Sequence, residues 1–218
     1  TLGSTNISVR RLVETALEED IGPQDVTSET LIPPGLQAKG EVLVKENGVL
    51  AGTRVSRLAF KTADSSLRVR ILRPDGSKVR KGDLVMQIIG SAAGMLKAER
   101  VALNFLQRLS GIATQTSRYV QAVEGLPVKI MDTRKTTPGL RRLEKQAVRM
   151  GGGVNHRLGL YDGVIIKDNH LRLCKSLEMS LADVISQAKL RAPSRMAVEV
   201  EAKNLDEVQE ALGAGADT

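Results

Sequence analysis

Aromatic side chains are scarce in this sequence of 218 residues, which has two Phe, two Tyr and no Trp. Proteins that bind single-stranded nucleic acid stack the bases on aromatic rings, so this sequence has few of the residues that such binding uses. Its single cysteine, Cys174, permits no internal disulfide and leaves no second thiol for a metal cluster, which fits a reducing compartment. No apolar run approaches the roughly 20 residues of a membrane-spanning helix, and residues 1–12 lack the apolar core of a signal peptide. We therefore expect a cytoplasmic protein with no membrane partner.

Basic residues outnumber acidic ones by 32 to 25, which gives the chain a net charge of +7. An excess of positive charge attracts anions, which include nucleic acid, a membrane surface and small substrates with several negative charges. Composition alone does not choose among them. The scarcity of aromatic rings favours small anions, so we expect no nucleic-acid partner.

The first 90 residues combine one helical segment with a β-rich region. Apolar residues between Val9 and Leu17 recur at the spacing of an amphipathic helix. Apolar and charged residues then alternate, as in residues 67–71, and Asn47-Gly48 and Asp75-Gly76 are typical of hairpin turns. This pattern predicts a small antiparallel sheet with hairpin turns.

The pattern becomes helical at residues 96–123, and short apolar strands then alternate with helices, as in βα units around a parallel sheet. The switch predicts two structural units that meet between residues 90 and 110. Thr137-Pro138 is typical of a helix start, and the triple glycine 151–153 of a helix end. The expected strands of the second unit are residues 128–131, 163–166 and 196–200.

Charged side chains follow all three of these expected strands. Asp-Thr-Arg-Lys (132–135) follows the first strand and Lys167 the second, while Glu199 and Glu201 share one face at the end of the third. Reacting groups collect at the carboxyl ends of parallel strands, because the loops there surround one crevice. The pattern therefore predicts a charged crevice at these strand ends.

Such a crevice would hold at least three cations, Arg134, Lys135 and Lys167, with His156 and Arg157 nearby. Only a strongly anionic ligand would offset their mutual repulsion. Arg suits bidentate recognition of a carboxylate or phosphate, whereas Lys acts as a compact point charge. A phosphorylated sugar beside a carboxylated ring would use both kinds.

Plainer interpretations stay open for each residue taken singly. An Arg or Lys at a strand end is commonly a solvated surface charge, and a lone His is commonly structural. The triple glycine either ends a helix or lets a ligand approach the backbone, and it lacks the GxxxxGK[ST] pattern of a P-loop. The clustering of charge at three successive strand ends favours the functional interpretation.

Five segments of the sequence resemble one known family. They are EEDIGPQDVTS (18–28), AERVALNFLQRLSGIAT (98–114), DTRKTTPGLR (132–141), GGGVNHRLGLYDGVIIKDNH (151–170) and VEVEAKNLDE (198–207). The family is quinolinate phosphoribosyltransferase, also called nicotinate-nucleotide pyrophosphorylase (carboxylating). The likeness spans nearly the whole chain, and its two central segments are long and nearly gapless.

The resemblance implies an α/β fold, with an N-terminal α/β sandwich domain (1–107) followed by an α/β barrel (108–218). It also implies a homodimer in which Arg100 reaches into the partner's site, with any higher assembly left open. Family members continue beyond the equivalent of Thr218 into further strands, an aspartate near the metal, and phosphate-binding loops. We therefore expect an incomplete barrel in this chain.

The same resemblance implies substrate-binding roles. Arg134 and Arg157 match guanidinium groups that bind the pyridine dicarboxylate, His156 lines the same pocket, and Thr133 belongs to the same binding loop. Lys135 and Lys167 match lysines that serve the quinolinate and phosphoribosyl pyrophosphate sites.

Catalytic roles and a cofactor follow from the same likeness. Glu201 matches a glutamate near the ribose and its metal, and with Lys135 and Lys167 it makes up the expected catalytic set. The cofactor that the resemblance implies is Mg²⁺, which accompanies the pyrophosphate.

The implied reaction joins quinolinate to phosphoribosyl pyrophosphate and gives nicotinate mononucleotide, pyrophosphate and CO2, a step of NAD biosynthesis. The nearest alternative is a related phosphoribosyltransferase acting on nicotinate, whose single carboxylate would need fewer cations. Two more distant alternatives are a nucleic-acid binding module, which rests only on the net charge, and a carrier-like binding module. The carrier-like module is considered because GSKVRKGDLV (76–85) resembles the hairpin of biotinyl or lipoyl domains. It lacks a carrier lysine in a matching turn.

Overall fold

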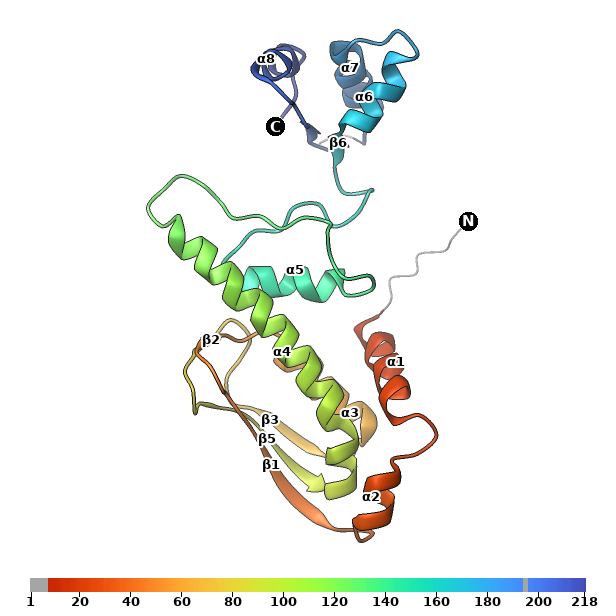
Figure 1. Ribbon diagram of the computed structural model, residues 1–218, viewed down its shortest axis with the longest axis vertical. Coiled ribbons are helices and arrows are strands. Elements are labelled where there is room, and N and C mark those ends of the chain that lie inside the picture. The colour runs from red at the N-terminus through yellow and green to blue at the C-terminus, as the bar shows by residue number, and fades with distance from the viewer. Residues whose placement is uncertain (1–7, 194–195) are drawn as a thin grey trace. The chain divides into compact units, whose positions relative to one another are not determined.

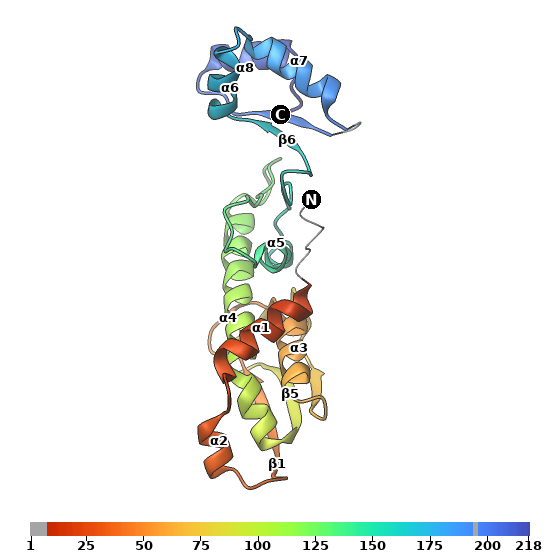
Figure 2. The ribbon, with the colours of Figure 1, turned by 90° about the vertical axis from the view of Figure 1, so that its right-hand side faces the viewer.

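The computed structural model describes residues 8–193 and 196–218 (Figures 1 and 2). These residues form two compact units, one ending at His156 and the other beginning at Arg157. No helix in the described ranges is long and apolar enough to cross a bilayer. The elements of the first unit are α1 (Val9–Ile21), α2 (Val26–Leu31), β1 (Gln37–Leu43), β2 (Gly48–Val49), α3 (Thr53–Ala63), β3 (Arg68–Ile71), β4 (Lys78–Val79), β5 (Leu84–Ser91), α4 (Ala92–Ala122) and α5 (Arg141–Met150).

The first unit contains the expected antiparallel sheet, with strand order β1-β5-β3. Gln37 pairs with Ser91 and Arg68 with Ile89, so β5 is the central strand. The turn expected at Asn47-Gly48 does not join neighbouring strands of this sheet, because β2 pairs with β4 in a separate ribbon. The hairpin prediction for Asn47-Gly48 is therefore wrong, since local turn chemistry does not reveal which distant strand becomes the partner.

Helix α3 lies where the sequence pattern predicts only strands, and that prediction is wrong. Val55, Ala59 and Phe60 recur at helical spacing and are buried. Gly52, at φ +95°, precedes the helix, and a Cβ there would lie 2.8 Å from Leu109 Cδ1. A glycine at this position therefore permits both the left-handed turn and the close approach of α4.

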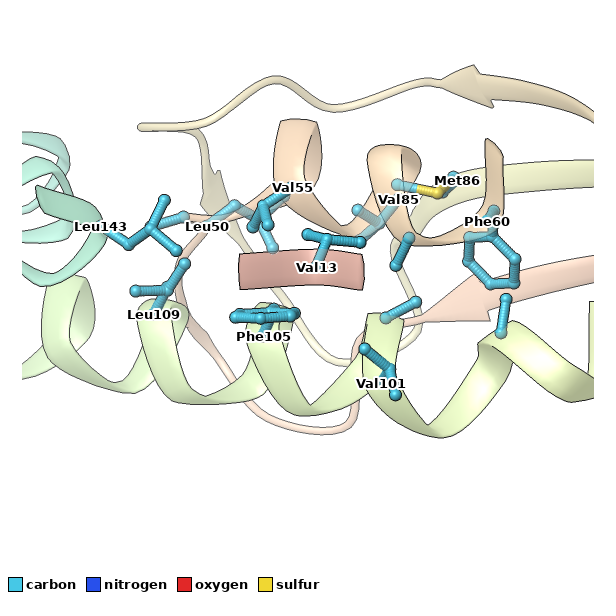
Figure 3. Close-up of a cluster of buried hydrophobic side chains, with 14 of the residues drawn as sticks. Val13, Leu50, Val55, Phe60, Val85, Met86, Val101, Phe105, Leu109 and Leu143 are labelled. Carbon is cyan, nitrogen blue, oxygen red and sulfur yellow. The ribbon is translucent and has the colours of Figure 1, made fainter. Parts of the chain in front are cut away.

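The core of the first unit lies among α1, α3, α4 and β5 (Figure 3). Val101, Phe105 and Leu109 project at four-residue intervals from α4, and α1 inserts Val13 among them. Leu143 of α5 joins the same cluster. Burial of this apolar surface therefore fixes α5, which borders the candidate site, to the rest of the unit.

Helix α4 confirms the expected helix at residues 96–123 and extends it toward the N-terminus. Ser91 caps it by accepting a hydrogen bond from the backbone N–H of Gly94, so the helix begins at Ala92. The helix runs without a break through the boundary expected at residue 107. That domain boundary stays a prediction.

Two local predictions near α5 are wrong. Residues 128–131 form no strand, and only an isolated parallel bridge joins Met131 to Val154. Helix α5 begins at Arg141, with Leu140 as its N-cap, instead of at Pro138. Thr137 Oγ1 instead accepts a hydrogen bond from Arg108 Nη2 of α4, and this contact competes with a capping role.

The second unit contains a parallel strand pair covered by three helices (Figure 2). Ile166 and Val198 of the strands are buried against Ile185 and Ala211 of the helices. Strands were expected at 163–166 and 196–200, and both are confirmed in shortened form. The elements are β6 (Val164–Ile166), α6 (Asp168–Lys175), α7 (Leu181–Arg191), β7 (Val198–Val200) and α8 (Leu205–Gly213).

Candidate functional site

A buried ion pair lies between the segments that carry the expected site residues of the first unit. Asp132 and Lys145 are bonded through Oδ1 and Nζ, and their side chains are 7% and 3% exposed. Asp132 Oδ1 accepts a hydrogen bond from the backbone N–H of His156 at 2.9 Å, and Lys145 Nζ donates to the carbonyl of His156 at 2.9 Å. Asn155 Nδ2 donates to Asp132 at 2.5 Å and to the Lys145 carbonyl at 2.7 Å. These contacts fix the backbone at His156 relative to Asp132.

A second charged cluster joins α4, α5 and the loop between them. Glu144 Oε1 accepts from Arg108 Nη2 at 2.6 Å and from Nε at 3.0 Å. Its other oxygen accepts from the backbone N–H of Thr137 at 3.1 Å. Burial acts to raise the pKa of Glu144, but the hydrogen bonds from Arg108 and Thr137 outweigh it and hold the pKa below its usual range. Glu144 is therefore ionised at neutral pH.

The loop that precedes α5 carries Thr133, Arg134 and Lys135. Thr133 and Lys135 are exposed, and Thr133 Oγ1 accepts from the backbone N–H of Lys135 at 3.0 Å. Arg134 is half-buried, and its buried Nε has no hydrogen-bond partner among the described residues. A buried guanidinium N–H without an acceptor is suited to an anionic ligand. The loop thus presents two cations on one short segment.

In the second unit, Lys167 and Glu201 form an ion pair through Nζ and Oε1. Each residue directly follows a strand, and the backbone N–H of Glu201 donates to the Ile166 carbonyl at 2.9 Å. The pair therefore lies at the carboxyl edge of β6 and β7, where the sequence pattern places reacting groups. Both side chains are about half exposed, so solvent reaches them.

Arg157 is anchored within the second unit. Its Nη1 donates to the Gly163 carbonyl at 2.8 Å, while its buried Nε has no hydrogen-bond partner in the described ranges. One edge of the guanidinium group is therefore fixed and the Nε–H is left for another acceptor. The side chain is half-buried, which limits competition from water.

The triple glycine is explained by packing and helix termination. Gly151 is the C-cap of α5, and a Cβ added there would overlap the Ala113 carbonyl oxygen of α4. A Cβ on Gly153 would lie 2.7 Å from Val148 Cγ1 and 3.2 Å from the Ile130 carbonyl oxygen. The contacts at these two glycines are with the protein itself, so the helix-end interpretation is favoured over ligand approach.

The structure brings Thr133, Arg134, Lys135 and His156 around the Asp132–Lys145 network, and brings Lys167 to Glu201. Arg100 is exposed on α4 and lies outside both groups. Within the described ranges, no group of three His, Cys, Asp or Glu residues is arranged to hold a metal ion.

Sequence reasoning assigned no role to four charged residues of these networks: Arg108, Asp132, Glu144 and Lys145. One signal could have found one of them. Glu144 lies three positions before the core residue Ala147 and so flanks the apolar face of a short amphipathic helix, whereas Lys145 points away from that face in the helical pattern.

Comparison with known proteins gives matches over nearly the whole chain. Two family profiles match: "Quinolinate phosphoribosyl transferase, N-terminal domain" over residues 25–110 and "Quinolinate phosphoribosyl transferase, C-terminal domain" over residues 112–218. A Bacillus subtilis protein named "Probable nicotinate-nucleotide pyrophosphorylase (carboxylating)" is 41% identical over 97% of this chain and 72% of its own length. A Synechocystis protein of the same name is 44% identical over 90% of this chain and 65% of its own length.

A solved structure agrees with these sequence matches. The crystal structure of NadC from Streptococcus pyogenes aligns with a TM-score of 0.89 at 43% identity, covering 96% of this chain and 73% of that one. The mixed α/β architecture of this chain is therefore similar to that of a solved protein. This chain spans between 65% and 73% of the length of these three proteins.

Proposed function

Because the chain belongs to the quinolinate phosphoribosyltransferase family, a family of pentosyltransferases, we propose that it transfers phosphoribose from phosphoribosyl pyrophosphate to quinolinate. The pyridine nitrogen attacks C1 of the sugar, and the C1–oxygen bond to pyrophosphate breaks. The 2-carboxylate then leaves as CO2, its bonding electrons stay on the ring carbon, and a proton replaces it. The products are nicotinate mononucleotide, pyrophosphate and CO2.

The Lys167–Glu201 pair at the carboxyl edge of β6 and β7 is the observation that carries this proposal. Positive charge develops on the sugar as pyrophosphate leaves. A carboxylate held beside C1 stabilises that charge more in the transition state than in the ground state. We assign this role to Glu201. Lys167 fixes the position of the carboxylate and supplies a positive charge for the phosphate groups.

We assign Arg134 and Arg157 to the carboxylates of quinolinate. Each has a buried Nε–H without a described acceptor, and a carboxylate supplies two acceptor oxygens in the plane of a guanidinium group. Lys135, Thr133 and His156 complete the assigned contacts.

Magnesium is proposed as part of the sugar substrate. Mg²⁺ keeps several waters and is commonly held by one or two carboxylates together with substrate phosphates. Glu201 is the carboxylate that we assign to this ion.

We also propose a homodimer in the cytoplasm, with Arg100 contributing to the partner subunit's site. Support comes from the exposure of Arg100 on α4, where it makes no ion pair with a described residue, and from its match to the family's bridging arginine. The test is the Arg100→Ala protein, which should lose activity if Arg100 reaches the partner subunit's site. Unchanged activity of this variant would rule out the assignment of Arg100.

The test of function is quinolinate-dependent release of pyrophosphate and CO2 from phosphoribosyl pyrophosphate with Mg²⁺. A parallel reaction contains nicotinate in place of quinolinate. Equal amounts of pyrophosphate and CO2, formed only with quinolinate, are the expected result. Release of pyrophosphate with nicotinate, and without CO2, would show that nicotinate is the substrate and would refute the proposal. Nicotinate has a single carboxylate, which the product keeps.

A further inference from the structure

We propose that Glu144 and Lys145, two buried neighbours on α5, are positioning residues for the loop at residues 132–137. Each holds one end of this loop, which carries the assigned cations Arg134 and Lys135. The identity of the ligand that binds this loop rests on the proposed function. The evidence for positioning is independent of it and comes from the contacts of α5.

Lys145 holds the beginning of the loop. Its Nζ is bonded to Asp132, the first residue of the loop, and the pair is almost fully buried. The same Nζ donates to the carbonyl of His156 at 2.9 Å. One ammonium group therefore sets the distance between the start of the loop and His156, which is another assigned substrate contact.

Glu144 holds the end of the loop. Its Oε2 accepts from the backbone N–H of Thr137, the last residue of the loop, at 3.1 Å. Its Oε1 is bound by Arg108 of α4, whose Nη2 also donates to Thr137 Oγ1. The loop end is thus bonded through both backbone and side chain to a carboxylate that cannot move without breaking its ion pair.

The loop belongs to no strand or helix, and its backbone bonds to the rest of the unit are few, such as Asp132 N–H to the Val154 carbonyl at 3.2 Å. Arg141 of the same helix adds bonds to Thr136 Oγ1 at 3.1 Å and to the Arg134 carbonyl at 3.3 Å, so α5 supplies most of the side-chain contacts that place the loop. A buried charge is stable only where its partners lie in good geometry, so the loop can take few positions in which Glu144 and Lys145 both keep their bonds. Two consecutive helical residues of opposite sign therefore act together as a two-point clamp on the cationic loop.

A purely structural role for Glu144 makes a different prediction. If the residue only stabilised the packing of α4 on α5, its loss would lower the melting temperature and leave substrate affinity unchanged in the folded molecules. If it positions the loop, the Michaelis constant for quinolinate rises while the protein stays folded. In that case, loss of Glu144 also makes the loop amides exchange faster with solvent, because the bond that holds Thr137 N–H is gone.

The experiment compares Glu144→Gln with Arg149→Gln in the full chain. Both remove one charge from α5, but Arg149 is exposed and makes no hydrogen bond with the loop. Hydrogen–deuterium exchange of peptides covering residues 132–140 reports loop order without any substrate. KM and kcat for quinolinate, at saturating phosphoribosyl pyrophosphate, report positioning. Glu144→Asp serves as the conservative variant.

For Glu144→Gln we expect exchange in the loop to be at least about fivefold faster, and KM for quinolinate to rise about tenfold, roughly a 1.4 kcal/mol loss. Arg149→Gln should match the wild type, and Glu144→Asp should recover part of the affinity. Unchanged loop exchange, or faster exchange with an unchanged KM, would overturn the proposal.

If the wild type does not turn over quinolinate, the proposed function fails, and loop exchange alone then decides whether Glu144 orders the loop. If Glu144→Gln does not fold, Thr137→Pro, which removes the bonded N–H, is measured in the same way.

Discussion

Replacing Lys145 with Met should strongly destabilise the first unit. The substitution keeps an unbranched side chain of similar size but removes the ammonium group that bonds to Asp132 and to the His156 carbonyl. Asp132 would keep its bonds from Asn155 and from the His156 N–H, yet its charge would stay buried without a cation. Removal of one partner from a buried ion pair commonly costs about 3–5 kcal/mol, and we expect a loss in this range.

Addition of Asp132→Asn to Lys145→Met should restore part of that loss. The amide oxygen of Asn can still accept from the His156 N–H, and no unpaired charge is left in the interior. Replacing both partners of a buried ion pair with neutral residues costs far less stability than removing only one partner. We therefore expect the double variant to be at least about 1 kcal/mol more stable than Lys145→Met alone.

Urea denaturation followed by far-ultraviolet circular dichroism measures these differences, because the chain has no Trp for fluorescence. Lys129→Met provides the matched control, since Lys129 is exposed and should change stability by less than about 0.5 kcal/mol. A loss below about 1 kcal/mol for Lys145→Met would refute the reasoning. So would a double variant less stable than Lys145→Met.

Three further predictions address the site and its support. Glu201→Gln should lower kcat at least about tenfold in steady-state assays, because the carboxylate that stabilises the developing positive charge is lost. Arg134→Lys should raise KM for quinolinate, since Lys lacks the planar fork of the guanidinium group; a wild-type KM would reject the assignment of Arg134 to a carboxylate of quinolinate. The folded pKa of Glu144 is depressed, so its contribution to stability is fully present above its unfolded value of 4.5 and is lost as pH falls through the folded pKa. The stability difference between wild type and Glu144→Gln should therefore shrink in melts below pH 4.5, and a constant difference would contradict this.

Gly151→Ala tests the packing interpretation of the triple glycine. An added methyl group would overlap the Ala113 carbonyl oxygen, and overpacking of this kind commonly costs about 1–3 kcal/mol. A drop in melting temperature with unchanged KM values is expected. An altered KM at unchanged stability would instead favour ligand approach to this backbone.

The features that the sequence predicts correctly depend on local pattern. Apolar spacing identifies α1 and α4, and short apolar runs between helical segments identify the strands that follow residue 160. Charge directly after a strand places Lys167 and Glu201 at the same sheet edge, because adjacent parallel strands end together. These inferences need only the neighbours of each residue along the chain and the geometry of one element.

The features that it misses depend on partners distant in the sequence. The Asn47-Gly48 turn has the local chemistry of a hairpin, yet Gly48 of β2 pairs with Val79 of β4. The backbone N–H of Val49 also donates to Thr114 Oγ1 of α4, another partner distant in the sequence. The segment at residues 128–131 has strand-like composition, but in the described chain it gains only one isolated bridge, from Met131 to Val154.

Buried charge shows the same dependence most clearly. Glu144 and Lys145 have the composition of a solvated helix surface, and only the positions of Asp132, Thr137 and Arg108 make their burial favourable. A charge in the interior persists where its partners are fixed, so its presence beside a cationic loop restricts that loop in turn. For this reason the loop residues assigned to quinolinate should be sensitive to substitutions in α5 that touch no substrate.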